Sequence, residues 1–76
     1  MYRIPVRFKV VRNGRIIEAF LDRRLSFNEN MKMLNGIMDE KITVFYVYDP
    51  YKRIFLDRDT PLYEFNFRSF MFFYLF

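Results

Sequence analysis

The last seven residues, Phe70-Met71-Phe72-Phe73-Tyr74-Leu75-Phe76, contain no charge, glycine or proline. Aromatic side chains favour strands, and a run this short suits a strand better than a helix. Because apolar residues stand at both parities, we expect both faces of this strand to be covered, as in the middle of a sheet. At an edge it would invite aggregation. The chain is therefore predicted to fold back and pair with both sides of this segment.

The length of 76 residues predicts one domain, residues 1–76. The chain has no Cys and no His, so disulfides, thiolate ligands and imidazole bases are excluded. A core must supply the stability, and 53% hydrophobic content with 11 Phe and 6 Tyr can form one. The lack of Cys fits a reducing cytoplasm, where we expect this protein. No signal peptide is visible, and no charge-free run is long enough for a helix that spans a membrane.

Residues 2–10 alternate between apolar and polar side chains, which is typical of a half-buried strand. Asn13-Gly14 then predicts a hairpin with a two-residue type I′ turn, followed by a second strand over residues 15–21. Such a turn sets the register. The expected inward pairs are Val10 with Ile17, Phe8 with Ala19, and Val6 with Leu21; the expected outward pairs are Lys9 with Glu18, and Arg7 with Phe20.

A helix is predicted to begin at Ser26, because Ser26 and Glu29 have the spacing of a capping box. The apolar stripe of this helix is Phe27, Met31, Leu34 and Met38. Its end is expected between Asn35 and Asp39, either in a left-handed cap at Asn35 or Gly36 or after continuing to Met38.

In the second half of the chain, the sequence predicts shorter strands and turns. Residues 42–48 are strand-like, and Asp49-Pro50-Tyr51-Lys52 has proline at the second position of a turn. A short strand over 53–56, a polar connection over 57–61 and one helical turn over 62–65 are expected before the terminal strand.

This order of elements resembles the ubiquitin-like β-grasp family. The residues that carry the resemblance are the Asn13-Gly14 hairpin, the helix opening at 25–29, and the segment Leu56-Asp57-Arg58-Asp59-Thr60-Pro61-Leu62-Tyr63-Glu64-Phe65-Asn66-Phe67. The resemblance implies an α+β fold with a mixed four- to five-stranded sheet. It further implies the strand order 2-1-5-3-4, with the last strand central and parallel to the first, and one main helix packed on one face.

The sequence departs from ubiquitin at its end, because Phe76 closes the chain without a flexible tail or a Gly-Gly pair. We therefore expect no conjugation to other proteins; a longer chain ending in Gly-Gly would indicate a sulfur carrier or modifier precursor. Tail-less relatives of this architecture include the bacterial YukD-like proteins, which are associated with type VII secretion. That resemblance implies an accessory binding role.

The chemistry of an enzyme is hard to assemble from these residues. No Cys–His pair or Ser–His–Asp triad can form, and two glycines cannot build a phosphate-binding loop. Asp57 and Asp59 could offer oxygen ligands to a cation, but Asp is common in solvated turns. We therefore expect a non-enzymatic protein with no cofactor and no metal.

Thirteen Lys and Arg residues give a net charge of +4, and five of them lie in the first hairpin. The basic residues could bind RNA or DNA, with aromatic rings on a sheet as stacking platforms. They could also form the solvated face of the first strand, which is the interpretation we favour. Nucleic-acid binding is kept as the alternative function.

The aromatic residues suggest an interface. If Met71, Phe73 and Leu75 face the helix, then Phe72, Tyr74 and Phe76 point away from it, and Tyr46 and Tyr48 join them. A contiguous apolar patch edged by basic residues is typical of a binding surface. The expected partner is another protein or a second copy of this chain. The candidate interface consists of Arg7, Lys9, Tyr46, Tyr48, Phe72 and Tyr74.

Overall fold

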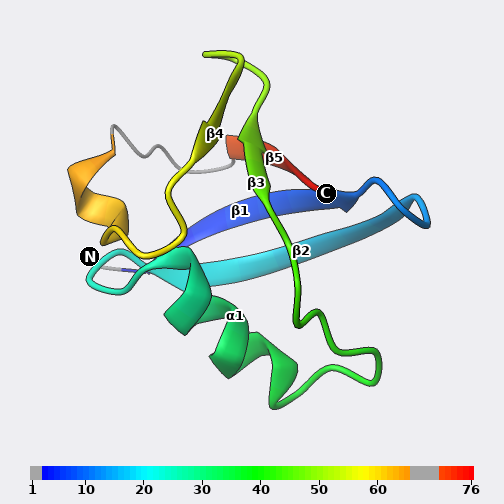
Figure 1. Cartoon of the computed structure of the whole chain (residues 1–76). Helices are drawn as coiled ribbons and strands as arrows, with labels where there is room; N and C mark the ends of the chain where they lie inside the picture. Colours follow the sequence, from blue (N-terminus) through cyan, green and yellow to red (C-terminus); the bar gives the residue numbers. More distant parts are fainter. Residues whose placement is uncertain (1–2, 66–70) are drawn as a thin grey trace.

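The structure is a computed structural model that describes residues 3–65 and 71–76. It is an α+β arrangement in which one helix lies against a five-stranded mixed sheet of order β2-β1-β5-β3-β4 (Figure 1). The elements are β1 (Arg3–Val10), β2 (Arg15–Asp22), α1 (Phe27–Asn35), β3 (Val47–Asp49), β4 (Ile54–Leu56), the 3₁₀ turn η1 (Leu62–Glu64) and β5 (Met71–Leu75). The predicted strand order is confirmed.

The central position predicted for the terminal strand is also confirmed. β5 pairs in parallel with β1 and antiparallel with β3, so it has a neighbour on each side. The pairing with the third strand continues past β5, since the backbones of Tyr46 and Phe76 exchange hydrogen bonds of 2.8 and 2.9 Å. Phe70, which was predicted to begin the strand, lies outside the described residues.

The predicted register of the first hairpin is wrong by two residues. Val10 opposes Arg15 rather than Ile17, because residues 11–14 form a longer turn. Only Gly14 of this turn is left-handed, at φ 74°, whereas a type I′ turn needs two such residues. The Asn13 side chain instead accepts a 2.9 Å hydrogen bond from the Arg15 N–H.

A shift of two residues exchanges partners but keeps every side chain on its predicted face. The inward pairs become Ile4 with Leu21 and Phe8 with Ile17, all of them buried. On the outer face the predicted pairs Lys9 with Glu18 and Arg7 with Phe20 are not formed. Glu18 lies opposite Arg7, Ile16 opposite Lys9, and Phe20 opposite Pro5.

The capping box at the start of α1 is confirmed. The Ser26 hydroxyl accepts from the Glu29 N–H, and the Glu29 carboxylate accepts from the Ser26 N–H, both at 3.1 Å. The helix ends at Asn35 without the left-handed cap, because Gly36 has φ −65° and Asn35 is itself helical. The Asn35 side chain bonds both backbone groups of Ile42, at 2.7 and 2.8 Å, and so fixes the chain after the helix.

The strand predicted over residues 42–48 is shorter, because β3 covers only Val47–Asp49. Tyr46 continues the pairing with Phe76, but side chains hold the backbone of Ile42 and Phe45 in place of a strand partner. Asn35 binds Ile42, and Arg58 Nη1 donates to the Phe45 carbonyl at 2.7 Å. The predicted turn after β3 is present, and Arg53 closes it in a left-handed conformation with φ 58°.

The core lies between α1 and the sheet face that α1 covers (Figure 1). Three phenylalanines form its centre: the rings of Phe8 and Phe73 are 6.1 Å apart, and Phe27 of the helix lies 6.4 and 5.8 Å from them. Phe73 and Leu75 are buried, as the predicted parity of β5 requires. In the described ranges, no helix has the length and apolar character needed to cross a membrane.

Candidate interaction surface

The sheet face opposite α1 carries aromatic and basic side chains. We call it the open face and define it by the outward positions of the strands together with Phe76. These residues are Ile16, Glu18 and Phe20 of β2, Arg3, Pro5, Arg7 and Lys9 of β1, Phe72 and Tyr74 of β5, Tyr48 of β3, and Phe55 of β4.

Five of the six predicted interface residues come together on this face. Arg7 lies beside Phe72, and Lys9 lies beside Tyr74, in the parallel pairing of β1 and β5. Tyr48 lies on the other side of Tyr74, in the pairing of β3 and β5. The Phe72 and Tyr74 rings are in edge contact at 5.3 Å.

The sixth predicted residue, Tyr46, precedes β3. Its ring is 53% exposed and lies 4.8 Å from the guanidinium carbon of Arg58. Arg58 also holds the neighbouring Phe45 carbonyl. Tyr46 is therefore positioned by the loop after β4, and its ring packs on a cation.

The structure adds a second aromatic group that the predicted set did not include. Phe55 and Phe76 pack against Tyr48, with ring centroids 5.0 and 6.1 Å from it and 5.7 Å from each other. Phe55 is 61% exposed, and Phe76 is half exposed. The outward parity of Phe76 was visible in the sequence. That of Phe55 depends on its pairing with Tyr48, which no local pattern specifies.

A hollow of about 560 Å³ lies over β1 and β2 on the open face. Its walls come from four parts of the chain: Phe20 and Glu18 of β2, Pro5 and Arg7 of β1, Phe72 of β5, and Tyr51 of the turn after β3. Phe20 is 66% exposed and Tyr51 is 67% exposed, so aromatic surface is accessible in the walls of the hollow. A single apolar side chain from a partner could enter this hollow.

A second hollow, of about 450 Å³, lies between α1 and residues 42–45. Polar side chains that already bond one another or the backbone contribute much of its wall. Asn28 donates to Asp59 at 2.6 Å, and Asn35 binds Ile42. The first hollow is the better candidate for a binding site, because exposed aromatic rings border it.

The charges of the open face are unevenly distributed. Arg7 and Glu18 form a 2.8 Å ion pair across β1 and β2. Lys9 lies between Ile16 and Tyr74 and is exposed, and no carboxylate of the described residues lies within ion-pair distance of it. The sequence-based pairing of Lys9 with Glu18 would have neutralised this ammonium group; the observed register leaves it charged among apolar neighbours.

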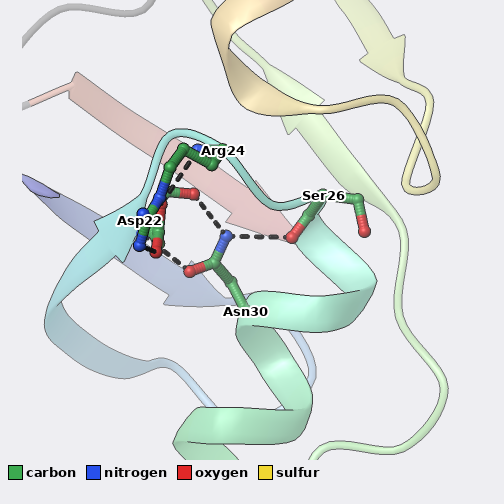
Figure 2. A network of polar contacts seen from close by, with 4 residues as sticks. All are labelled: Asp22, Arg24, Ser26 and Asn30. Atoms are coloured by element: carbon green, nitrogen blue, oxygen red, sulfur yellow. Dashed lines mark hydrogen bonds and ion pairs between the residues drawn. The ribbon is translucent and has the colours of Figure 1, made fainter. Parts of the chain in front are cut away.

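A polar network holds the end of β2 to the start of α1 (Figure 2). Asn30 is buried, and its amide binds the backbone of Asp22 and the carbonyl of Ser26. The Asp22 carboxylate accepts two hydrogen bonds from the Arg24 guanidinium, at 3.0 and 2.8 Å. These bonds lower the pKa of Asp22 from 3.8 to about 2. The network fixes the strand that carries Phe20 and Glu18.

Asp57 and Asp59, the two carboxylates considered as cation ligands, support the turn that contains them. Asp57 Oδ1 accepts the Asp59 N–H at 2.9 Å, and Asp59 Oδ1 binds the Asn28 amide. Over residues 3–65 and 71–76, no group of three or more acidic side chains is arranged to hold a metal ion.

The comparison with known proteins identifies the fold alone. No protein-family model matches the chain, and no curated protein matches it. The structure is similar to a chain of the toluene 4 monooxygenase HD complex with the inhibitor 4-bromobenzoate, with a TM-score of 0.69. The similarity covers 96% of this chain and 95% of that chain at 13% sequence identity, a level that carries no conclusion about activity.

Proposed function

We propose that this chain is a non-enzymatic interaction module of the ubiquitin-like β-grasp type, and that it binds another protein through the open face. The observation that carries the proposal is a continuous row of rings on the open face. It runs from the half-buried Phe72 and Tyr74 through Tyr48 to the exposed Phe55 and Phe76. Contiguous apolar surface of this kind is uncommon on a monomer unless something binds to it.

Two features support the β-grasp assignment. A hairpin is followed by a helix, and the last strand enters the sheet beside the first and parallel to it. The YukD-like resemblance, with an accessory role in bacterial secretion and a cytoplasmic location, belongs to this proposal. The proposal also states that the chain catalyses no reaction.

The structural neighbour is consistent with a binding role. The chain that resembles this one was solved as part of a complex. A fold of this size can therefore serve as one component of an assembly. The open face is the surface through which we expect this chain to join its own partner.

The test of the proposal compares aromatic residues on and off the open face. Phe55→Ser and Phe72→Ser should abolish self-association or partner capture, measured by sedimentation and by pull-down. Tyr63→Ser is the matched control, because Tyr63 is 59% exposed but lies on η1. Equal behaviour of all three variants would place the interface elsewhere.

Nucleic-acid binding by the first hairpin is the alternative. Lys9 and Arg12 are exposed, which favours it, whereas Arg7 and Arg15 already face carboxylates, at 2.8 and 3.5 Å. A salt titration of oligonucleotide affinity separates the two functions. Phosphate contacts give a steep negative slope of log affinity against log salt.

A further inference from the structure

We infer that the partner of the open face is an acidic protein segment, in which a carboxylate stands close to an aromatic or large aliphatic side chain. This inference rests on the proposed function and specifies its partner. It follows from two features of the open face: its charges specify the partner's carboxylate, and its hollow specifies the partner's apolar side chain.

Lys9 is the residue that we expect to bind the carboxylate of the partner. Its ammonium group is exposed and unpaired among the described residues, and its strand neighbours Ile16 and Tyr74 cannot neutralise it. Arg7 is a weaker candidate, because Glu18 already binds it and would repel an incoming carboxylate. An opposite charge next to Lys9 would therefore be the favourable complement on this part of the face.

The hollow is the site that we expect to receive the apolar side chain of the partner. Phe20, Tyr51 and Phe72 border it, and these rings are the kind of surface that anchors a buried side chain at an interface. Arg7 lines the hollow, and Lys9 is the next outward residue of β1, about 7 Å further along the strand. An extended partner segment would span that distance between alternate residues, so its carboxylate and its ring should stand two positions apart.

A second copy of the chain fits this face less well. Glu18 is the one carboxylate among the open-face residues named above, and Arg7 engages it. Asp22, the last residue of β2, is buried and paired with Arg24. Two open faces in contact would therefore set basic residues against basic residues. Charge complementarity favours an acidic partner over self-association.

The experiment uses the whole chain and polymers of defined composition. A random copolymer of glutamate and tyrosine is the probe, and binding is measured by fluorescence anisotropy of the labelled polymer. Polyglutamate, a lysine–tyrosine copolymer and oligo-dT are the comparison ligands. We expect the glutamate–tyrosine copolymer to bind most tightly and to weaken as salt is raised.

Three variants locate the binding. Phe20→Ser, at a side chain that is 66% exposed, should weaken the glutamate–tyrosine copolymer at least about tenfold. Lys9→Glu should weaken it about fivefold or more. Lys32→Glu makes the same charge change on α1, away from the open face, and should have little effect. Urea unfolding of each variant confirms that it is folded.

Other results would overturn the inference in recognisable ways. If the lysine–tyrosine copolymer bound as tightly as the glutamate–tyrosine copolymer and Phe20→Ser abolished that binding, the open face would remain an interface, but its partner would not be acidic. Equal binding of polyglutamate with no effect of Phe20→Ser would reduce the interaction to charge. If oligo-dT bound more tightly than the glutamate–tyrosine copolymer, the partner would be a nucleic acid. If the chain self-associated and Phe72→Ser abolished that association, the partner would be a second copy of the chain. If no polymer bound, the inference would be contradicted.

Discussion

The side-chain amide of Asn30 binds both backbone groups of Asp22: Oδ1 accepts the Asp22 N–H at 2.8 Å, and Nδ2 donates to the Asp22 carbonyl at 3.0 Å. The helix thus binds the backbone of the last residue of β2, which pairs with Arg3 of β1 on its other side (Figure 2). Asn30→Leu leaves these buried groups unsatisfied and should lower the free energy of unfolding by about 1–3 kcal/mol, measured in urea. Asn28→Ala removes an exposed hydrogen bond and serves as control. Equal stability of Asn30→Leu and the wild type would contradict this role.

The Asp22–Arg24 contact predicts a dependence of stability on acid. The folded pKa of Asp22, about 2, lies below its ordinary value of 3.8, chiefly because of the hydrogen bonds from the Arg24 side chain. The unfolded state therefore binds the proton first, and the stabilisation present above about pH 4 is lost as the pH falls towards about 2.

Arg24→Ala tests this dependence. The variant keeps only the hydrogen bond from the Arg24 backbone N–H, so the pKa of Asp22 should move back towards its ordinary value. The difference in unfolding free energy between wild type and variant should shrink as the pH falls from about 5 to about 2. A difference that stays constant over this range would show that Arg24 does not act through the Asp22 charge.

The buried and exposed rings should respond very differently to truncation. Phe73 is fully buried at the centre of β5, and Phe73→Ala should cost about 3–5 kcal/mol, a large part of the stability of a small domain. Phe55→Ala, at an exposed ring, should change stability by about 0.5 kcal/mol or less. Thermal or urea unfolding measures both, and similar losses for the two variants would contradict the assignment of faces.

Gly14 is the one residue of the first turn that needs a left-handed backbone. With φ 74° and no atoms near the position of a Cβ, its requirement is conformational rather than steric. Gly14→Ala should therefore destabilise the chain by about 1 kcal/mol, and Gly14→Asn by less, because Asn tolerates this conformation better. If both substitutions were neutral, the hairpin would not depend on this turn geometry.

The elements that could be predicted from the sequence are those with a strong local pattern. Alternation identified β1, and the Asn13-Gly14 turn indicated that β2 follows it. The spacing of Ser26 and Glu29 identified the start of α1, and the unbroken aromatic run identified β5 as central. The parity argument also placed Phe72 and Tyr74 on the open face.

The errors occurred where the observed contacts differ from the local preference of the sequence. Asn13-Gly14 favours a two-residue turn, but the chain uses a longer one and shifts the register. Residues 42–46 favour a strand, but side chains of Asn35 and Arg58 bind the backbone of Ile42 and Phe45. The hollow could not be predicted either, because Tyr51 reaches it only through the path of the turn after β3.

The most direct test of the central claim is a map of backbone amide chemical shifts during titration with the glutamate–tyrosine copolymer. We predict that the amides that move are those of β1, β2 and β5 around Arg7, Lys9, Phe20, Phe72 and Tyr74, while those of α1 stay in place. Shifts confined to α1 and residues 42–45, or no shifts at all, would contradict the claim that the open face is where this protein binds.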